Sequence, residues 1–318
     1  MKSRKVFVTG MSGYIGTRIC RELDRLDWCE KFYGMDVKKP LYKYEKGEFR
    51  VMDINDPGLI DWVSEIKPDI LIHLAYVLQE MHDVDLMRRI NFEGSKNALK
   101  AASKAGISQI LVASSGTAYG AWPDNPVLLK EDDTLRPNPG FFYAVDKARI
   151  EGLCQEYLKD YPDTIMSLIR PCVVYGPHVD NYLSELLNWP VYAGFKGHKP
   201  PLQCVHEDDV VRAIICILEN QAKGCFNIAP ADTVTLEEVY KLTKRPYLMM
   251  PDFCVSLAVA LIWNLRIPIL NISCVSLDYI RFPWVIDNSR FCDELGFMYQ
   301  YSTRETVEIM LQSKGILS

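Results

Sequence analysis

The chain has few of the residue patterns that hold metals or disulfides. Its ten cysteines include no CxxC pair, and its five histidines form neither an HExxH motif nor a cluster with cysteine. Structural and catalytic zinc sites are built from such closely spaced ligands. We therefore expect no metal site, and we expect free thiols in a cytoplasmic protein.

An excess of basic residues is also missing. The chain has 36 Lys and Arg against 41 Asp and Glu, a formal net charge of -5, so no broad basic surface can neutralise nucleic-acid phosphates. The first residues run directly into a strand pattern without an apolar signal segment. We expect neither a nucleic-acid partner nor secretion.

The composition that is present is typical of a soluble globular protein, with 48% hydrophobic and 24% charged residues. A chain of 318 residues can bury about 75% of its unfolded surface without disulfides. This length favours two domains, or one large α/β body with an added lobe.

Short apolar strands alternate with helical segments from the start of the chain to about residue 170. Continuous apolar strands joined by helices indicate parallel strands that are covered on both faces. We predict an α/β fold over residues 1–175, a doubly wound parallel sheet of the Rossmann type. The expected strands are Val6–Val8, Phe32–Asp36, Phe49–Ile54, Ile70–Ala75, Ile110–Ser114 and Ile165–Ile169.

Past residue 175 this alternation breaks at a proline-rich stretch. A helical pattern follows at Val210–Leu218, and Thr235 with Glu238 forms a capping-box pattern that predicts another helix. We expect residues 176–318 to form mainly a smaller substrate-binding lobe, with residues 203–230 returning to the Rossmann domain.

An unusually apolar stretch covers Phe253–Leu277, where Arg266 is the only charge in 25 residues. Its length would suffice for a membrane span, but Asn264 and Pro268 interrupt it. A buried or lid-forming helix is favoured over a segment that inserts into a membrane surface. We expect no membrane contact.

A glycine turn follows the first expected strand. Gly10, Gly13 and Gly16 are three residues apart, where the backbone must approach a pyrophosphate at a helix N-terminus. The spacing is GxxGxxG rather than GxGxxG, and an ordinary strand-to-helix turn would explain one or two of these glycines. Asp36 ends the second strand 20 residues later, where a carboxylate binds ribose hydroxyls and repels a 2′-phosphate, so we predict NAD rather than NADP.

A possible acid–base pair lies in a later helical segment. Tyr143 and Lys147 are four residues apart and project from one helix face. We expect the Lys147 ammonium to lower the pKa of the Tyr143 phenol. Upstream, residues 112–120 place several hydroxyls just beyond the fifth strand, where ligands bind in open parallel sheets.

Together these segments resemble the extended short-chain dehydrogenase/reductase family, also called the NAD-dependent epimerase/dehydratase family. The likeness covers residues 4 to about 230, with a weaker echo in Val285–Phe297. The matching segments are TGMSGYIG, Asp36, MDI at Met52–Ile54, HLA at His73–Ala75, NFEG at Asn91–Gly94, SSGTAYG at Ser114–Gly120, YAVDK at Tyr143–Lys147, IRPCVVYGP at Ile169–Pro177 and VHEDDVV at Val205–Val211.

The resemblance implies roles for individual residues. Tyr143 would be the acid/base, Lys147 would bind the nicotinamide ribose, and Ser115 would hydrogen-bond the substrate oxygen, with Ser114 and Thr117 as alternatives. Thr117 and Val173 would contact substrate. The implied cofactor contacts are Gly10, Gly13, Tyr14, Ile15, Gly16, Asp36, Asp53, Ile54, Leu74, Ala75, Asn91, Ser114, Tyr143, Lys147 and Pro171.

The chain departs from the family pattern at several positions. Family dehydratases carry an Asp-Glu pair where this chain has Gly116 and Thr117, which disfavours dehydration. Family nucleotide-sugar epimerases usually have Asn at the place of Val173 and Arg at the place of Leu202. Both hold the nucleotide diphosphate, and losing such contacts disfavours a UDP-sugar. Three arginines could compensate: Arg212, Arg266 and Arg281.

Three functions remain open. We favour an NAD-dependent oxidoreductase that interconverts a secondary alcohol and a ketone, because the apolar stretch, with Trp263 and Trp284 close by, suits a hydrophobic substrate. The alternatives are an NAD-dependent nucleotide-sugar epimerase that keeps its NAD bound, and a non-catalytic NAD-binding protein. His206 and its neighbouring aspartates are interpreted as supports between the lobes. By the resemblance, helices near Asp85–Lys104 and Tyr143–Lys159 would pair in a homodimer.

Overall fold

The computed structural model describes residues 3–78, 81–180, 191–267 and 273–317. Its centre is a sheet of seven parallel strands in the order β11-β6-β5-β4-β1-β2-β3. The predicted α/β doubly wound fold is therefore confirmed. The strands are β1 (Arg4–Thr9), β2 (Cys29–Asp36), β3 (Gly47–Val51), β4 (Ile70–His73), β5 (Gln109–Ala113), β6 (Ile165–Pro171) and β11 (Gly224–Ile228).

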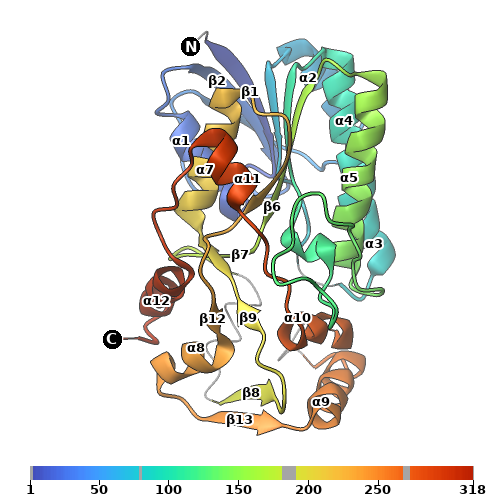
Figure 1. The fold of residues 1–318 in the computed structure, drawn as a ribbon. Coiled ribbons are helices and arrows are strands. Elements are labelled where there is room, and N and C mark those ends of the chain that lie inside the picture. Colours follow the sequence, from blue (N-terminus) through green and yellow to red (C-terminus); the bar gives the residue numbers. More distant parts are fainter. Residues whose placement is uncertain (1–2, 79–80, 181–190, 268–272, 318) are drawn as a thin grey trace.

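Helices cover both faces of this sheet (Figure 1). Along β1, Val6 and Val8 join one hydrophobic core and Phe7 joins the other, which explains why the strand is apolar at every position. One face carries α1 (Tyr14–Leu23), α7 (Glu207–Asn220) and α11 (Ser289–Leu295). The opposite face carries α2 (Gly58–Ile66), α4 (Gly94–Ala105) and α5 (Phe142–Asp160), with α3 (Val84–Arg88) and the π-helical turn η1 (Arg89–Glu93) leading into α4.

The expected strands are present, with shifted ends. The segment expected at Phe49–Ile54 forms β3 and leaves the sheet at Met52, and β4 ends at His73 rather than Ala75. The sequence patterns did not indicate β11, which is short and carries the buried polar Asn227. It pairs with β6 and completes the edge of the sheet.

The remaining elements extend beyond the carboxyl ends of the strands, toward the lower end of Figure 1. They include three two-stranded sheets, and the capping box of Thr235 and Glu238 is formed as expected. The sheets pair β7 (Val173–Tyr175) with β10 (Cys204–His206), β9 (Pro201–Leu202) with β12 (Val234–Thr235), and β8 (Tyr192–Phe195) with β13 (Tyr247–Met250). The helices here are α8 (Leu236–Thr243), α9 (Asp252–Asn264), η3 (Cys274–Leu277), α10 (Asp278–Arg281) and α12 (Thr303–Ser313).

The apolar stretch contains α9, which is largely exposed, so of the expected buried or lid-forming helix the buried alternative is wrong. Val259 is its one buried residue, and Phe253 is 71% exposed. Residues 268–272 of the stretch lie outside the described ranges. No helix in the described part of the chain combines the length and apolarity that crossing a membrane would require.

Candidate active site

A cavity of about 650 Å³ lies at the carboxyl ends of the strands, between the sheet and the lobe. Of the eighteen residues given a catalytic, cofactor or substrate role in the sequence analysis, thirteen line it and five do not. The lining residues are Gly10, Gly13, Tyr14, Ile15, Gly16, Leu74, Ser114, Ser115, Thr117, Tyr143, Lys147, Pro171 and Val173. The five others are Asp36, Asp53, Ile54, Ala75 and Asn91.

The glycine turn is packed so tightly that two of its glycines admit no side chain. Gly10 has a positive φ of 75°, and a Cβ added there would lie 2.7 Å from the Ala75 nitrogen. A Cβ at Gly16 would lie 1.9 Å from the Gly10 oxygen.

Gly13, the remaining glycine of the turn, has a different role. It caps α1 without a side-chain hydrogen bond, and a Cβ there would contact only the Gly10 oxygen, at 3.2 Å. The first N–H groups of α1 therefore stand beside the cavity with room for an anion, as a dinucleotide pyrophosphate requires.

Asp36 is held beside this turn, although it does not line the cavity. Its carboxylate accepts the backbone N–H groups of Ser12 and Lys38, both at 3.1 Å. The Lys38 residue lines the cavity. The carboxylate is thus fixed at the end of β2, next to the glycine turn, which is where a ribose hydroxyl could be bound.

The Asp36→Asn substitution should raise the dissociation constant for NAD at least about tenfold, because it removes a charged hydrogen-bond acceptor. Discrimination against NADP should fall by the same order. Titration calorimetry with both nucleotides measures this. Asp24→Asn is a matched control, because the Asp24 carboxylate also accepts two backbone N–H groups, those of Glu45 and Lys46. Equal effects of the two substitutions would remove Asp36 from the cofactor site.

Of the other four residues, Ala75 lies against Gly10, and Asn91 and Ile54 are buried behind the site. Asn91 is fully buried, and its side chain both donates to and accepts from the backbone of Val77, which fixes the segment after β4. Ile54 is buried against Gly94. The Asp53 carboxylate accepts the Asn55 N–H at 2.8 Å. Contact of Asp53 and Ile54 with an adenine stays a prediction.

The hydroxyl groups after β5 have two different sets of partners. Ser115 caps the short helix η2 (Gly116–Tyr119), and its Oγ accepts from Thr117 Oγ1 at 2.9 Å and from the Thr117 N–H at 3.2 Å. Ser115 lies close enough to Tyr143 for its hydroxyl to lower the pKa of the phenol. The Ser114 hydroxyl instead donates to the buried carboxylate of Glu151. Ser115 and Thr117, rather than Ser114, therefore provide the hydroxyls beside Tyr143.

Tyr143 and Lys147 lie in the first turns of α5, together with an aromatic residue that the sequence patterns did not indicate. Lys147 Nζ donates to the Ala113 carbonyl at 2.6 Å and lies 3.5 Å from the ring centroid of Tyr76. The Tyr76 ring packs edge-on against Tyr143 at 5.3 Å. Tyr76 directly follows the HLA segment, and its place in the chain was the one available signal for it.

The expected electrostatic coupling of this pair is wrong for the cavity as it stands. Burial raises the pKa of Tyr143 to about 12, although the nearby Ser115 hydroxyl opposes this. Burial also lowers the pKa of Lys147 to about 7. Removal from water sets the direction of both shifts, because desolvation penalises each charged form.

The buried Lys147 makes a specific prediction about stability. The unfolded chain keeps the Lys147 proton up to its ordinary pKa of 10.5, whereas the folded chain releases it near 7. The wild-type protein should therefore gain stability from this group as pH rises from 7 to 9. Lys147→Met lacks this gain, so its free energy of unfolding relative to wild type should fall by about 2 kcal/mol over that range. Urea unfolding at both pH values measures it, and a constant difference, as expected for exposed Lys100→Met, would contradict it.

The wall around Tyr143 is aromatic and aliphatic. Phe141 packs against both Tyr143 and Tyr279, and Tyr279 packs against Trp284, with ring centroids 5.0 to 5.9 Å apart. The Tyr279 hydroxyl donates to the Thr117 carbonyl at 2.7 Å. The lobe adds further apolar lining residues: Cys172, Val173, Val174, Pro200, Pro201, Leu202 and Ile280.

No arginine lines the cavity within the described residues, where the charged lining residues are Lys38, Lys147 and Asp180. Arg212 pairs with Asp209, and Arg281 pairs with Asp252 and Asp278. Arg266 is exposed beyond the end of α9. Lys, Arg and His are absent from the internal segments outside the described ranges, which are 79–80, 181–190 and 268–272. The three arginines that could compensate for Val173 and Leu202 therefore stand elsewhere.

His206 and Asp209 support the chain outside the cavity, as interpreted from the sequence. The His206 ring packs on Tyr301 at 4.0 Å. The buried Asp209 carboxylate accepts the backbone N–H groups of Gln300 and Tyr301. The pair thus holds the segment that enters α12.

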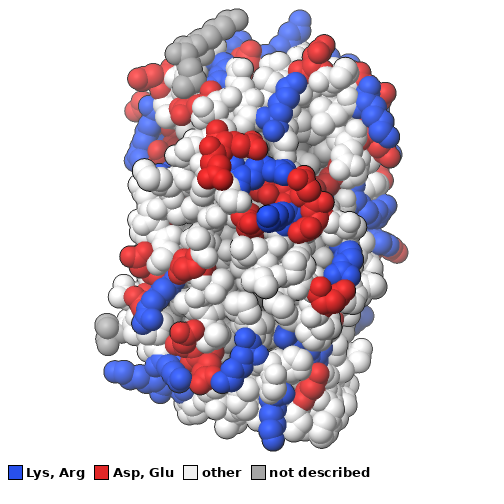
Figure 2. All heavy atoms as spheres, in the orientation of Figure 1, with Lys and Arg blue, Asp and Glu red and all other residues white. Residues whose placement is uncertain are grey.

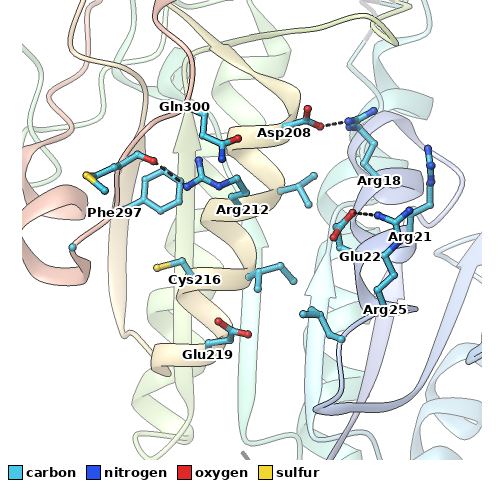
Figure 3. Close-up of a pocket in the computed structure, with 15 residues that line it drawn as sticks. Arg18, Arg21, Glu22, Arg25, Asp208, Arg212, Cys216, Glu219, Phe297 and Gln300 are labelled. Carbon is cyan, nitrogen blue, oxygen red and sulfur yellow. Dashed lines mark hydrogen bonds and ion pairs between the residues drawn. The ribbon is translucent and has the colours of Figure 1, made fainter.

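A second hollow, of about 720 Å³, lies between α1 and α7 (Figure 3). Its arginines are occupied: Arg18 pairs with Asp208, Arg25 pairs with Glu22, and Arg21 stacks over the Tyr42 ring. Of the residues predicted for the site, only Arg212 lines this hollow, and it pairs with Asp209. The Tyr143 cavity is therefore the candidate active site.

Fold and cavity together define a class, a Rossmann protein with a dinucleotide cradle beside a buried Ser-Tyr-Lys set. The model of the NAD dependent epimerase/dehydratase family matches residues 6–229, and the chain belongs to this family. The family description names NAD as the cofactor, in agreement with the prediction from the glycine turn and Asp36.

Relatives and solved structures extend this likeness over the whole chain. An uncharacterised Mycobacterium tuberculosis protein is 24% identical over 98% of this chain and 84% of its own length. An uncharacterised Staphylococcus aureus epimerase/dehydratase is 25% identical over 98% and 96%. A Bacillus cereus UDP-glucuronic acid 4-epimerase, crystallised with NAD and UDP-4-deoxy-4-fluoro-glucuronic acid, is 19% identical with a TM-score of 0.75, covering 98% of this chain and 99% of that chain.

Proposed function

We propose that the protein is an NAD-dependent oxidoreductase that interconverts an apolar secondary alcohol and the corresponding ketone. The observation that carries this proposal is the wall around Tyr143, which is aromatic and aliphatic and has no arginine among its described residues. Val173 and Leu202 belong to this wall. A pocket with one small polar cluster in an apolar lining suits a neutral, largely apolar ligand.

In this proposal, Ser115 binds the substrate oxygen and Tyr143 Oη exchanges the proton. During oxidation, the alcohol hydroxyl gives its proton to the Tyr143 phenolate while the carbinol carbon loses a hydride, so a ketone forms. NAD, when bound, supplies the hydride acceptor. Lys147, held by the Ala113 carbonyl at 2.6 Å, would bind the ribose and stabilise the phenolate.

The pKa values of the pair favour proton exchange only when the cavity is filled. Burial raises the pKa of Tyr143 to about 12, so a positive charge near the phenol is needed to reach the phenolate at neutral pH. The oxidised nicotinamide ring carries such a charge, and we propose that it acts together with Lys147.

A panel of alcohols tests this proposal. Secondary alcohols of increasing chain length should reduce NAD, followed as NADH absorbance, with KM falling as apolar area grows. UDP-glucose and UDP-glucuronic acid should be inactive and should not compete. Binding of UDP alone, at concentrations at which an apolar alcohol does not bind, would contradict the proposed substrate class.

A nucleotide-sugar epimerase is the second candidate. It is favoured by the Bacillus cereus structure, whose name specifies UDP-glucuronic acid 4-epimerase. An epimerase would use Ser115, Tyr143 and Lys147 to oxidise a carbon and then reduce the same carbon, with NAD kept bound. The apolar residues Val173 and Leu202 weigh against it, because a diphosphate binds best to charged donors. A non-catalytic NAD-binding protein would not need the buried pair of Tyr143 and Lys147.

We also propose a cytoplasmic homodimer. All ten cysteines are free thiols, as in reducing compartments. Helices α4 and α5 lie beside each other on one outer face (Figure 1), and the family resemblance pairs these helices between two copies. Light scattering at micromolar protein should give twice the mass of 36.4 kDa, and a single-chain mass would contradict the dimer.

A further inference from the structure

Helix α9 exposes a continuous apolar stripe. Phe253, Leu257, Leu261 and Leu265 are 71%, 58%, 52% and 68% exposed. They are spaced four residues apart, so they lie along one side of the helix. Leu265 is the first residue after the helix. We call these four residues the α9 stripe.

The opposite side of α9 already has its own apolar partners. Val255, Val259 and Ile262 pack in a small core with Phe195 and Leu277. The helix is therefore apolar on both sides, whereas a helix at a protein surface normally turns polar residues to solvent. Packing within the lobe explains the inner side and leaves the α9 stripe without a role in the fold.

The end of the lobe that carries α9 has more basic than acidic residues, unlike the whole chain. Residues 191–200, 236–267 and 273–281 contain seven Lys and Arg and four Asp and Glu, in a chain of net charge -5. The exposed Asp83 follows His82, whose ring stacks on Trp263 of α9. Lys244 precedes the strand before α9, and Arg266 follows the α9 stripe; both are exposed. Asp252, the acid at the start of the helix, is neutralised by Arg281 at 2.6 Å.

The space-filling view shows the same arrangement. At the lower end of the molecule, Lys and Arg side chains, with Asp and Glu side chains between them, stand out from a largely uncharged surface (Figure 2). An apolar helix face followed by a basic residue, in a lobe end with more basic than acidic residues, is the pattern of helices that lie in the interface of an anionic bilayer.

We propose that the α9 stripe docks the protein on an anionic lipid bilayer. The four side chains expose roughly 500 Å² together, taking about 200 Å² for a fully exposed large apolar side chain. A stable protein dimer needs about 800 Å² from each partner. The stripe is thus small for a second copy of the chain, but it is a contiguous patch of the size that marks an interaction site.

The inner side of α9, opposite the α9 stripe, contacts elements that line the cavity. Helix α9 packs on η3, and the residues Ser276, Tyr279 and Ile280 of η3 and α10 line the cavity. Trp263 of α9 stacks on His82 at 4.1 Å. Docking does not depend on the proposed reaction, but if both hold, an apolar alcohol dissolved in the bilayer would meet the lobe next to the cavity.

Flotation of the full-length protein with vesicles tests the proposal. Vesicles of phosphatidylcholine with phosphatidylglycerol should carry wild-type protein to the top of the gradient, and vesicles of phosphatidylcholine alone should carry much less. The double variant Leu257→Gln/Leu261→Gln should reduce the partition coefficient at least about tenfold. The double variant Leu41→Gln/Val127→Gln is a matched control, because its residues are 85% and 88% exposed away from α9 and should have no effect.

A charge variant separates the two parts of the interaction. Lys244→Glu/Arg266→Glu should lower binding to the anionic vesicles and leave the weak binding to neutral vesicles unchanged. Circular dichroism confirms that each variant is folded. Wild-type protein that stays at the bottom of the gradient, or α9 variants that float like wild type, would overturn the proposal. A fall in the oligomer mass of the Leu257→Gln/Leu261→Gln variant would assign the stripe to a second copy instead.

Discussion

The Tyr143→Phe variant should lose about 10² to 10⁴ in kcat, because it removes the one hydroxyl positioned to exchange the substrate proton. Tyr143 lies close to Ser115 and sits 5.7 Å, measured to its ring centroid, from Lys147 Nζ. The affinity for NAD should change little, because the ring and its packing against Tyr76 and Phe141 are kept. Initial rates of NADH formation, with NAD binding measured separately, test both statements.

Tyr76→Phe is the matched control for this experiment. The Tyr76 hydroxyl donates to the backbone carbonyl of Tyr143 at 3.1 Å and is not positioned to exchange a proton with substrate. Its loss should change kcat by less than about tenfold, the order expected for one neutral hydrogen bond. Full activity of Tyr143→Phe would remove the catalytic role and favour a non-catalytic NAD-binding protein.

The Glu151→Ala variant should lose about 3 to 5 kcal/mol of unfolding free energy, because it leaves the buried Arg170 charge without its carboxylate partner. The two side chains are 1% and 5% exposed, and Arg170 donates to both Glu151 oxygens, at 2.9 and 2.6 Å. Urea unfolding at neutral pH measures this. Replacing both with apolar residues, as in Glu151→Leu/Arg170→Leu, should restore part of the loss.

Glu156→Ala controls for the removal of a carboxylate from α5. Glu156 lies on the same helix and is exposed, so its replacement should change stability by less than about 0.5 kcal/mol. A loss below about 1 kcal/mol for Glu151→Ala would show that water reaches Arg170 and that the pair is not the rigid support described here. Ser114 would then be free to face the cavity.

The Rossmann sheet could be predicted because its central strands β1, β4 and β5 are buried on both faces and therefore read as continuous apolar runs. The glycine turn was also readable, since two of its glycines are required by backbone contacts within the turn itself. Strand β11 was missed because five residues with a buried Asn227 carry no such signal. Its place is set by pairing with β6, far away in the sequence.

The substrate side of the cavity could not be read in the same way. Tyr76, Tyr279 and Trp284 meet there from segments about two hundred residues apart, and no local period marks them. The choice between Ser114 and Ser115 depends on Glu151, a helix away. The spacing of Tyr143 and Lys147 placed them on one face, but it carried no information about burial, which sets the direction of both pKa shifts.

The apolar stretch Phe253–Leu277 shows the same limit of prediction from sequence. Its composition was visible in the sequence, and a buried or lid-forming helix was the expected outcome. Which side of α9 would find partners depends on the position of Phe195 and Leu277, and these come from other elements. The exposed side was therefore not foreseeable from composition.

The nucleotide content of the purified protein tests the central claim most directly. The protein is purified without added cofactor and denatured, and any released nucleotide is identified by chromatography with mass detection. An alcohol dehydrogenase exchanges its cofactor at each turnover, so we predict an empty site that binds added NAD. Stoichiometric NAD carried through purification would contradict the account and favour the epimerase, and released NADP would overturn the role given to Asp36.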